Sequence, residues 1–217
     1  MPGVAEASGV GNRGRRSELR VAQRAFTRAR FIDAAVVAFA EHGYVRTTID
    51  EIVQRAGATK ATFYLHFRGK ADILVELNGR VLEAFDGIYV DLGDLTRAPT
   101  WEGIRAWLAR AVERWERVRD YVAPLWEGAV VEPEIRALTE GDYDRQVEYL
   151  AAALAAARDD LTQADAEITA AILLMPLQHF FSKFIHGQQV DIDRVLDALA
   201  SAWLAIILHG APPRSRG

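Results

Sequence analysis

The sequence contains no cysteine, and none of its apolar stretches approaches the ~20 residues needed to span a bilayer. Without cysteine the chain has no disulfide bond and no thiolate metal site, which fits a reducing compartment. The first 24 residues also lack the apolar segment of a signal peptide. We therefore expect a cytoplasmic protein that does not enter a membrane.

Recognisable catalytic motifs are missing as well. The sequence has no glycine-rich phosphate loop and no Glu-x-x-His pattern of the kind found in di-iron helical proteins. Its 5 histidines are dispersed, and its acidic residues scatter along polar helix faces. An all-helical enzyme or cofactor carrier is thus a poor match, and we expect no catalytic residues, no cofactor and no metal.

Charge is divided unevenly along the chain, although the net charge is only −4. Residues 1 to 70 carry 12 Lys/Arg against 6 Asp/Glu, whereas residues 71 to 217 carry 14 against 24. A basic segment inside an acidic protein is typical of a local nucleic-acid-binding surface. Half of all residues are hydrophobic, so the acidic remainder can still bury a sizeable core.

Residues 47 to 67 contain two short helical patterns joined by a glycine turn. Thr48 and Glu51 have the spacing of a capping box, in which each side chain satisfies a free backbone amide at a helix start. Gly57 follows this helix at the position where a left-handed backbone ends it at little cost. The pattern predicts a helix-turn-helix, although an ordinary helical hairpin with a solvated face has the same shape.

The second helix of this segment has an apolar back and a polar front. Phe63 and Phe67 are one turn apart and point inward, and Thr59 can cap the start of the helix. Such a helix suits insertion into a DNA major groove. We expect phosphate contacts from Lys60, Tyr64, His66 and Lys70, and base contacts from Ala61, Thr62 and Leu65. The full set of expected DNA-binding residues is Arg46, Thr48, Thr59, Lys60, Ala61, Thr62, Tyr64, Leu65, His66 and Lys70.

Residues 28 to 77 resemble the TetR family of bacterial one-component regulators. The resemblance rests on Ala-Ala with a later Phe in the first helix, the Gly-Tyr exit at Gly43, the Thr-Thr entry, the Ala-Gly turn, and Phe-Tyr-Leu-His-Phe before Lys70. Two positions depart from the pattern: Ala61 stands where the family most often has glycine, and Arg68-Gly69 replaces a proline and a small residue. The second departure predicts a looser link to the next helix.

The resemblance and the helical periodicity together predict an all-α fold. We expect an N-terminal three-helix helix-turn-helix DNA-binding domain plus a larger C-terminal helical ligand-binding and dimerisation domain. The predicted divisions are a mobile basic arm (1–24), the DNA-binding domain (25–70), the effector-binding and dimerisation domain (71–210) and a tail (211–217). Arginines of the arm could reach the minor groove, or the arm could be a tail without a role.

Beyond residue 70 the pattern is helix after helix. The expected helices cover 70–92, 100–120, 121–131, 133–160, 162–187 and 191–210, with a break near 93–100. The last two are apolar on more than one side, which requires burial on more than one side. A homodimer formed by these two helices, with Leu199, Trp203 and Ile206 in the interface, satisfies that need. Burial of both helices inside a monomer is the alternative.

Five tryptophans are many for this length, and four of them fall between Trp101 and Trp126. Packed aromatic residues are usually core, but apolar pockets between helices are also the usual small-molecule sites. Pro176 falls within an otherwise helical pattern, where a kink can open space between helices. We expect an effector cavity lined by Trp107, Trp115, Tyr121, Trp126, Met175, His179 and Phe180.

The sequence therefore predicts a DNA-binding transcriptional regulator, as the resemblance implies. A homodimer would place two recognition helices on a palindromic double-stranded DNA operator, and a small apolar or aromatic effector would release this repressor. The alternative is a helical DNA-binding dimer without an effector.

Overall fold

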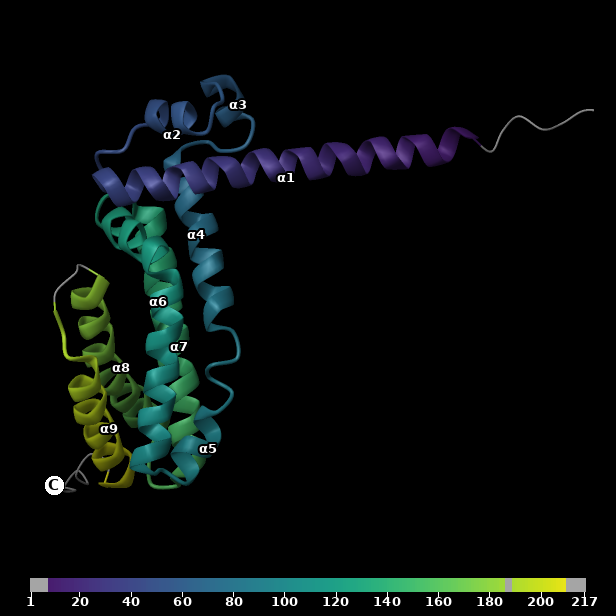
Figure 1. The fold of residues 1–217 in the computed structure, drawn as a ribbon. Helices are drawn as coiled ribbons and strands as arrows, with labels where there is room; N and C mark the ends of the chain where they lie inside the picture. The colour runs from purple at the N-terminus through teal and green to yellow at the C-terminus, as the bar shows by residue number, and fades with distance from the viewer. Residues whose placement is uncertain (1–7, 186–188, 210–217) are drawn as a thin grey trace, which may run out of the picture. The chain divides into compact units, whose positions relative to one another are not determined.

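The computed structural model describes residues 8–185 and 189–209, and these ranges contain nine helices and no strand (Figure 1). The all-α prediction is confirmed. In chain order the helices are α1 (Ser8–His42), α2 (Ile49–Arg55), α3 (Lys60–Tyr64), α4 (Lys70–Phe85), α5 (Leu92–Arg97), α6 (Trp101–Val131), α7 (Pro133–Ala157), α8 (Gln163–Ile185) and α9 (Ile192–His209).

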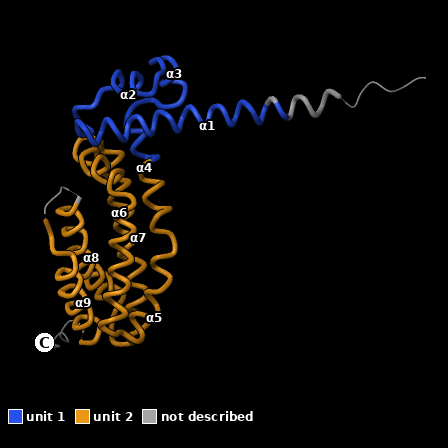
Figure 2. Tube along the Cα trace, in the orientation of Figure 1, with its two compact units in different colours: residues 1–76 blue, residues 77–217 orange. Residues whose placement is uncertain are grey.

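The chain divides into two compact units, residues 1–76 and 77–217, so the division falls within α4 (Figure 2). Unit 1 contains α1 to α3 and the start of α4, and unit 2 contains the rest of α4 and the later helices. In the described ranges, every helix is too short or too polar to cross a membrane.

Unit 1 is built around aromatic side chains that α1 and the α3 segment contribute. Phe31 is fully buried, and its ring meets Phe63 edge-on with centroids 5.3 Å apart and Phe67 at 6.3 Å. Edge-to-face contacts of this kind add about 0.5–1.5 kcal/mol beyond simple burial. Phe39 packs on Tyr44, which follows Gly43 at the end of α1. The short helices α2 and α3 thus gain their stability from packing on α1 rather than from their length.

The helix caps of unit 1 follow the sequence pattern. Thr48 accepts a hydrogen bond from the Glu51 backbone N–H, while the Glu51 carboxylate accepts from the Thr48 backbone N–H at 2.7 Å. Gly43 and Gly57 have φ of 78° and 59°, in the left-handed region where glycine is favoured. The predicted capping box and both predicted glycine exits are confirmed.

Helix α1 begins at Ser8, well before the segment that carries its apolar stripe. The sequence analysis assigned residues 1–24 to an arm without apolar periodicity, and the described side chains from Ser17 to Arg24 are all exposed. Residues with good helix propensity, such as Glu18, Leu19 and Arg20, extend the helix although nothing is buried there. The first seven residues of the predicted arm and the whole of the predicted tail lie outside the described residues.

The helix predicted over residues 70–92 is wrong only after Phe85. Helix α4 ends at Phe85, and Gly87 then adopts a φ of 73° in a turn that leads to α5. The indole Nε1–H of Trp107 donates to the Ile88 carbonyl at 2.9 Å and holds this turn. Helix α5 lies where the sequence predicted a break between helices. The observed break comes earlier, between Phe85 at the end of α4 and Leu92 at the start of α5.

Residues 100–120 and 121–131 form one helix, α6, rather than the two that the sequence predicted. Pro124 lies inside it and is buried. A proline removes one helical hydrogen bond, but packing on both sides of this position keeps Val122 and Leu125 buried and the helix continuous. Thr100 caps the start of α6 by accepting from the Gly103 N–H.

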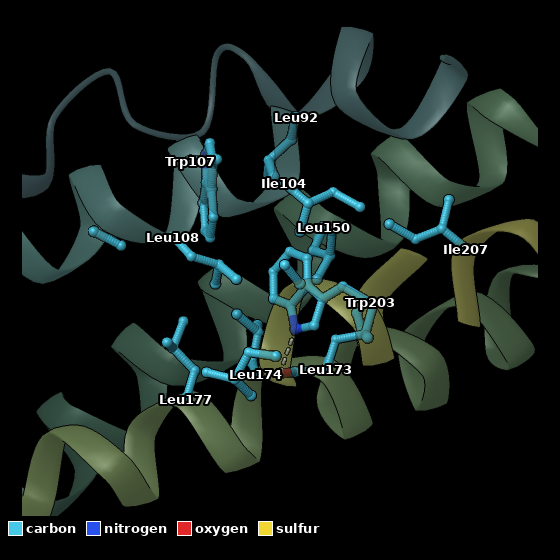
Figure 3. Close-up of a cluster of buried hydrophobic side chains, with 14 of the residues drawn as sticks. Leu92, Ile104, Trp107, Leu108, Leu150, Leu173, Leu174, Leu177, Trp203 and Ile207 are labelled. Carbon is cyan, nitrogen blue, oxygen red and sulfur yellow. Dashed lines mark hydrogen bonds between the residues drawn. The ribbon is translucent and has the colours of Figure 1, made fainter. Parts of the chain in front are cut away.

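The core of unit 2 joins α6, α7, α8 and α9 around two tryptophans (Figure 3). Trp107 and Trp203 lie with ring centroids 5.3 Å apart, and Trp203 is 1% exposed. The Trp203 indole N–H donates to the Leu173 carbonyl at 3.2 Å, the bond drawn as a dashed line in Figure 3. Leu199 belongs to the same cluster. Placing Leu199 and Trp203 in a dimer interface was therefore wrong, because both pack inside a single chain.

Candidate functional site

Helix α3 is a short helix held at one end by its cap and on one side by its core residue. The Thr59 hydroxyl accepts from the Thr62 backbone N–H at 3.2 Å, and Phe63 is fully buried beneath the helix. The cap fixes the start of the helix, and the buried ring fixes its rotation. Residues on the opposite face are consequently presented outward by a rigid support.

The outward face of α3 is apolar and aromatic as well as polar. Tyr64 is 55% exposed and Leu65, directly after the helix, is 72% exposed. Ala61 is exposed and Thr62 is half-buried. An exposed leucine beside a half-exposed tyrosine gives this short helix an apolar outer surface, which favours a contact surface.

The Lys60 ammonium lies 2.9 Å from a carboxylate oxygen of Asp50 in α2. The hydrogen bond to Asp50 and its charge raise the pKa of Lys60 above the ordinary lysine value. Both side chains remain largely exposed, so the pair is weak and can open toward a phosphate. Lys60 thus places a cation on the outward side of α3.

Three other predicted DNA-binding residues, Arg46, Thr48 and Thr59, precede α2 or α3 in the chain. Arg46 is exposed and its Nε–H donates to the His42 carbonyl at 2.8 Å. Thr48 and Thr59 are exposed N-cap residues, each with its hydroxyl accepting from a helix amide. Their hydroxyls support the starts of α2 and α3.

Lys70 has a different environment from the one predicted. Its ammonium donates to the backbone carbonyls of Tyr44, Val45 and Thr47 at 2.6, 3.2 and 2.9 Å, and it lies over the Tyr44 ring. An ammonium has three N–H donors, and these contacts use them all. In this geometry Lys70 clasps the turn between α1 and α2, and its phosphate contact stays a prediction.

His66 is also turned inward rather than toward solvent. Its Nδ1 is buried with no hydrogen-bond partner among the described residues, and its ring lies 6.0 Å from Phe31. Burial lowers the pKa of His66, and the charges of Arg24 and Arg28 lower it further. The lowered pKa favours the neutral form of the ring in this structure.

An ion pair connects the end of the α3 segment with α4. The Arg28 guanidinium donates to the His66 carbonyl and to the Glu76 carboxylate, both at 2.6 Å. Arg28 also lies 4.2 Å above the Phe67 ring centre. Arg28 of α1 thus connects His66, just after α3, with Glu76 of α4, and all three residues belong to unit 1.

The Arg68-Gly69 departure does not leave the link to α4 unsupported. Asp72 accepts from the Arg68 backbone N–H at 2.7 Å and from its guanidinium at 2.7 Å. The hydrogen bonds to Arg68 lower the pKa of Asp72. The looser link predicted from the missing proline is wrong, because a side-chain cap takes its place.

A second candidate site lies in unit 2, where a cavity of about 710 Å³ opens among α4, α6 and α7. The volume suits a drug-sized molecule. Its aromatic lining consists of Phe85, Tyr89, Trp115, Trp126, Tyr143 and Tyr149. Its charged lining consists of Asp86, Glu140, Asp142, Asp144 and Arg145.

Of the residues predicted to line an effector cavity, Trp115 and Trp126 line this cavity, and its role as an effector site stays a prediction. Trp107 lies in the core against Trp203 instead. Tyr121 is outside the lining, with its hydroxyl 3.5 Å from an Arg80 nitrogen.

The three predicted lining residues of α8 lie elsewhere. Met175 is 62% exposed and His179 is exposed, while Phe180 lines a much smaller cavity of about 30 Å³. Helix α8 is apolar on two sides, and the sequence could not show which side faced this space. Its residue in the large cavity is Gln178.

The wall formed by α4 and α7 was not predicted from the sequence. Asn78 and Asp142 are buried polar residues, and the Asn78 Nδ2–H donates to Asp142 at 2.7 Å. Tyr89 and Tyr149 stack in parallel with centroids 5.4 Å apart. The available signal was an asparagine within the apolar stripe of residues 70–85, because a buried amide needs a partner.

No group of three or more His, Asp or Glu side chains in the described part of the chain is placed to hold a metal ion. The two sites are thus a surface around α3 and an aromatic, acidic cavity. The surface around α3 presents side chains to solvent, and the cavity of unit 2 has room for a small molecule.

The sequence profile described as "Bacterial regulatory proteins, tetR family" matches residues 31–77, which span the end of α1, α2, α3 and the start of α4. Residues 31–77 therefore match the DNA-binding segment of the TetR family. "HTH-type transcriptional regulator TtgR" of Pseudomonas putida is 40% identical over 60 residues, 28% of this chain and 29% of that protein. "Fatty acid metabolism regulator protein" of Bacillus subtilis is 46% identical over 46 residues, 21% and 24% of the two chains.

These matches span only about a quarter to a third of the relatives' length, and they fall on the TetR-family helix-turn-helix. Solved structures extend the likeness to the whole fold. A TetR-like transcriptional regulator from Rhodococcus sp. RHA1 has a TM-score of 0.61 with 20% identity, covering 84% of this chain and 96% of that one. A SmeT–triclosan complex has a TM-score of 0.58 with 23% identity, covering 84% and 90%. At these identities the likeness shows a shared TetR-family fold.

Proposed function

We propose that this TetR-family chain is a DNA-binding transcriptional regulator that acts as a repressor in the bacterial cytoplasm. The observation that carries the proposal is helix α3, with Phe63 fully buried behind it and Tyr64 and Leu65 exposed in front. A capped, rigidly supported helix with an outward face of this kind fits a major groove. Relatives that match this segment are named as transcriptional regulators.

In this proposal the residues around α3 divide by the part of DNA they meet. Lys60, Arg46 and the exposed hydroxyl of Tyr64 contact phosphates, which supply affinity that depends on salt. Ala61, Thr62 and Leu65 face base edges, where the methyl groups of Ala61 and Leu65 can meet thymine methyls. Lys70 and Arg28 stabilise the fold of unit 1 and make no base contact.

The cavity in unit 2 is the proposed effector site. Its aromatic walls suit an apolar or aromatic molecule, and the structurally similar SmeT was solved in complex with triclosan. Helix α4 provides Val81, Leu82 and Phe85 to the cavity, and the same helix carries Glu76, the partner of Arg28. An effector that binds one position of α4 better than another shifts the populations of the two states, which is all that release from DNA requires.

The active form in this proposal is a homodimer through α8 and α9 on a palindromic operator. Helix α8 exposes Ile168, Ile172 and Met175 at a spacing of four and three residues, each more than half exposed. A continuous apolar row on a helix of a folded domain indicates a partner. Two-fold symmetry then sets two recognition helices into successive major grooves, about 34–36 Å apart.

The experiment begins with selection of binding sites from random double-stranded DNA by the purified protein. A palindromic consensus with two half-sites about one helical turn apart is the expected result. Binding of that site is then measured across a salt series for the wild type and for Thr62→Ala. Loss of discrimination at one base position in Thr62→Ala supports the groove contact, and binding that is indifferent to both salt and sequence would refute the DNA-binding function.

The effector part is tested on the same protein by adding hydrophobic compounds to the protein–DNA complex and by thermal shift. Trp126→Ala should change the response to a compound while leaving operator affinity nearly intact, because Trp126 lies in unit 2 at the cavity wall. If no compound shifts the wild type, the chain is instead a helical DNA-binding dimer without an effector.

A further inference from the structure

The chemistry of the cavity wall narrows the class of molecule that the effector site can take. Six aromatic rings line it, and several of them pack on one another. Tyr89 and Tyr149 stack in parallel, while Phe85 meets Trp115 edge-on with centroids 5.3 Å apart. Aromatic faces carry partial negative charge, so a cavity lined with them attracts a cation as well as an apolar group.

The charged side chains around the cavity also favour a cation. Four carboxylates belong to the described lining, those of Asp86, Glu140, Asp142 and Asp144, against the guanidinium of Arg145. Arg145 is already paired with Asp142, which also accepts from Asn78. Within the described ranges the other three carboxylates have no cationic partner. The lining therefore carries four acidic side chains against one basic side chain, and Asp86, Glu140 and Asp144 are exposed to solvent.

The pKa values of two tyrosines in the wall are raised by burial and by nearby carboxylates. Burial raises the pKa of Tyr89, and the charge of Asp142 raises it further. Burial likewise raises the pKa of Tyr143, with a further contribution from Asp144. The Tyr143 hydroxyl is shielded from solvent and has no hydrogen-bond partner among the described residues. Both rings thus stay neutral phenols at ordinary pH, and formation of another negative charge in this wall is opposed.

We propose that the cavity selects a lipophilic organic cation, a molecule with several apolar or aromatic groups around one permanent positive charge. This inference rests on the proposed effector function and specifies its ligand. The aromatic rings take up the apolar groups, and the carboxylates of Glu140 and Asp144 compensate the charge. An anion of the same shape meets three unpaired carboxylates, and a neutral molecule gains only the apolar contacts.

Tetraphenylphosphonium and tetraphenylborate provide the test, because the two ions have nearly the same shape and opposite charge. Binding of each to the full-length wild-type protein is measured by titration calorimetry and by quenching of tryptophan fluorescence, since Trp115 and Trp126 line the cavity. We expect tetraphenylphosphonium to bind at least about tenfold more tightly than tetraphenylborate. It should also release the protein from its selected operator.

The matched variant is the double substitution Glu140→Gln/Asp144→Asn, which removes two exposed charges and little volume. It should weaken tetraphenylphosphonium about tenfold and leave tetraphenylborate unchanged or tighter. The control Asp159→Asn/Glu167→Gln removes two exposed carboxylates that lie outside the lining and should leave both affinities unchanged. Circular dichroism and melting temperature of each variant verify that the fold is retained.

Three outcomes overturn the proposal: equal or tighter binding of tetraphenylborate, an unchanged affinity of the double variant for the cation, or no binding of either ion. Operator binding is measured separately in the absence of any compound, and it tests the regulator function by itself. A protein that binds its operator and responds to a neutral or anionic compound retains the proposed function and loses only the cationic class.

Discussion

At the scale of single residues, Asp50 competes with DNA for the Lys60 ammonium, which lies 2.9 Å from its carboxylate. Asp50→Asn removes the competing charge, and we expect operator affinity to rise about two- to fivefold, the strength of an exposed ion pair. Lys60→Ala should weaken binding to all sequences alike and reduce the slope of log affinity against log salt by about one. Fluorescence anisotropy of labelled operator across a salt series measures both effects.

The double variant Asp50→Asn/Lys60→Ala completes a thermodynamic cycle. If Asp50 acts through Lys60, its substitution gains nothing once the lysine is absent. Arg117→Ala, which removes an exposed cation of unit 2, is the control and should leave the salt slope unchanged. An equal gain from Asp50→Asn in the presence and absence of Lys60 would show that the carboxylate repels DNA directly.

His66 makes the stability of unit 1 depend on pH. Its pKa is lowered in the folded protein by burial and by Arg24 and Arg28, so the unfolded chain binds a proton first as pH falls. The stability of the fold therefore declines as pH drops below about 6.5, the ordinary histidine value, and the decline ends below the folded pKa. Urea unfolding at pH values of about 7.5, 6.5 and 5.5, which span this window, should show a shallower decline for His66→Gln than for the wild type.

His42→Gln is the matched control for this comparison, since His42 is an exposed histidine of the same unit. The difference between the two variants removes the contribution of carboxylates that titrate in the same range. A wild type and His66→Gln with parallel pH profiles would mean that the inward-facing ring costs nothing to protonate.

At the scale of whole elements, Lys70 attaches the start of α4 to the turn between α1 and α2 through three backbone carbonyls. Lys70→Met keeps most of the side-chain volume but leaves these carbonyls without their donor. We expect a loss of about 2 kcal/mol in the free energy of unfolding, the usual strength of hydrogen bonds to a charged group. Denaturant unfolding followed by circular dichroism measures this loss.

The same variant distinguishes the clasp from a phosphate contact. A clasp predicts lower stability and normal operator affinity at temperatures where the variant is folded, with an unchanged salt slope. Unchanged stability together with a salt slope reduced by about one would instead restore Lys70 to the DNA contacts. Lys60→Ala, on the exposed side, should show the opposite combination.

Element boundaries were predictable where a local rule determines them. The Thr48–Glu51 capping box and the glycine at Gly57 depend only on residues within one turn, and both are found in the structure. The continuation of α6 through Pro124 and the end of α4 at Phe85 depend on packing between distant segments. The Trp107 bond to Ile88, for example, joins residues 19 apart and leaves no local trace in the sequence.

The same distinction explains the candidate sites. The outward face of α3 follows from the position of Phe63 alone, so Tyr64 and Leu65 could be placed from the sequence. The cavity depends on which side of each long helix faces which neighbour. Trp115 and Trp126 were placed there correctly, but the α7 wall with Asp142 was missed, because a charged residue in a helix is usually solvated.

At the scale of the whole molecule, the exposed row of α8 is the dimer interface that we propose. Ile168, Ile172 and Met175 are 55%, 53% and 62% exposed, so they contribute little to the fold of one chain. Trp203, at 1%, belongs to that fold, and a glutamate there would unfold the protein rather than separate subunits. A variant that tests assembly must therefore change α8 and leave the α9 core intact.

Ile172→Glu meets that requirement. In a dimer the new carboxylate is buried without a partner, whereas in a monomer it is solvated, so we expect a folded monomer in sedimentation equilibrium and a wild-type dimer. Because a dimer binds both half-sites as one unit, the monomer should lose at least about a hundredfold in affinity for the palindrome. The affinity of the variant monomer for an isolated half-site should equal the affinity of one wild-type subunit for the same half-site.

Val130→Glu is the control, because Val130 is 72% exposed on α6, outside the proposed interface. It should sediment and bind the palindrome as the wild type does. A stable interface buries about 1,200–2,000 Å² in total. A charge introduced at the centre of such an interface is therefore shielded from solvent. If Ile172→Glu remains a folded dimer with full operator affinity, the subunits associate through another surface, and the apolar row on α8 needs a different partner.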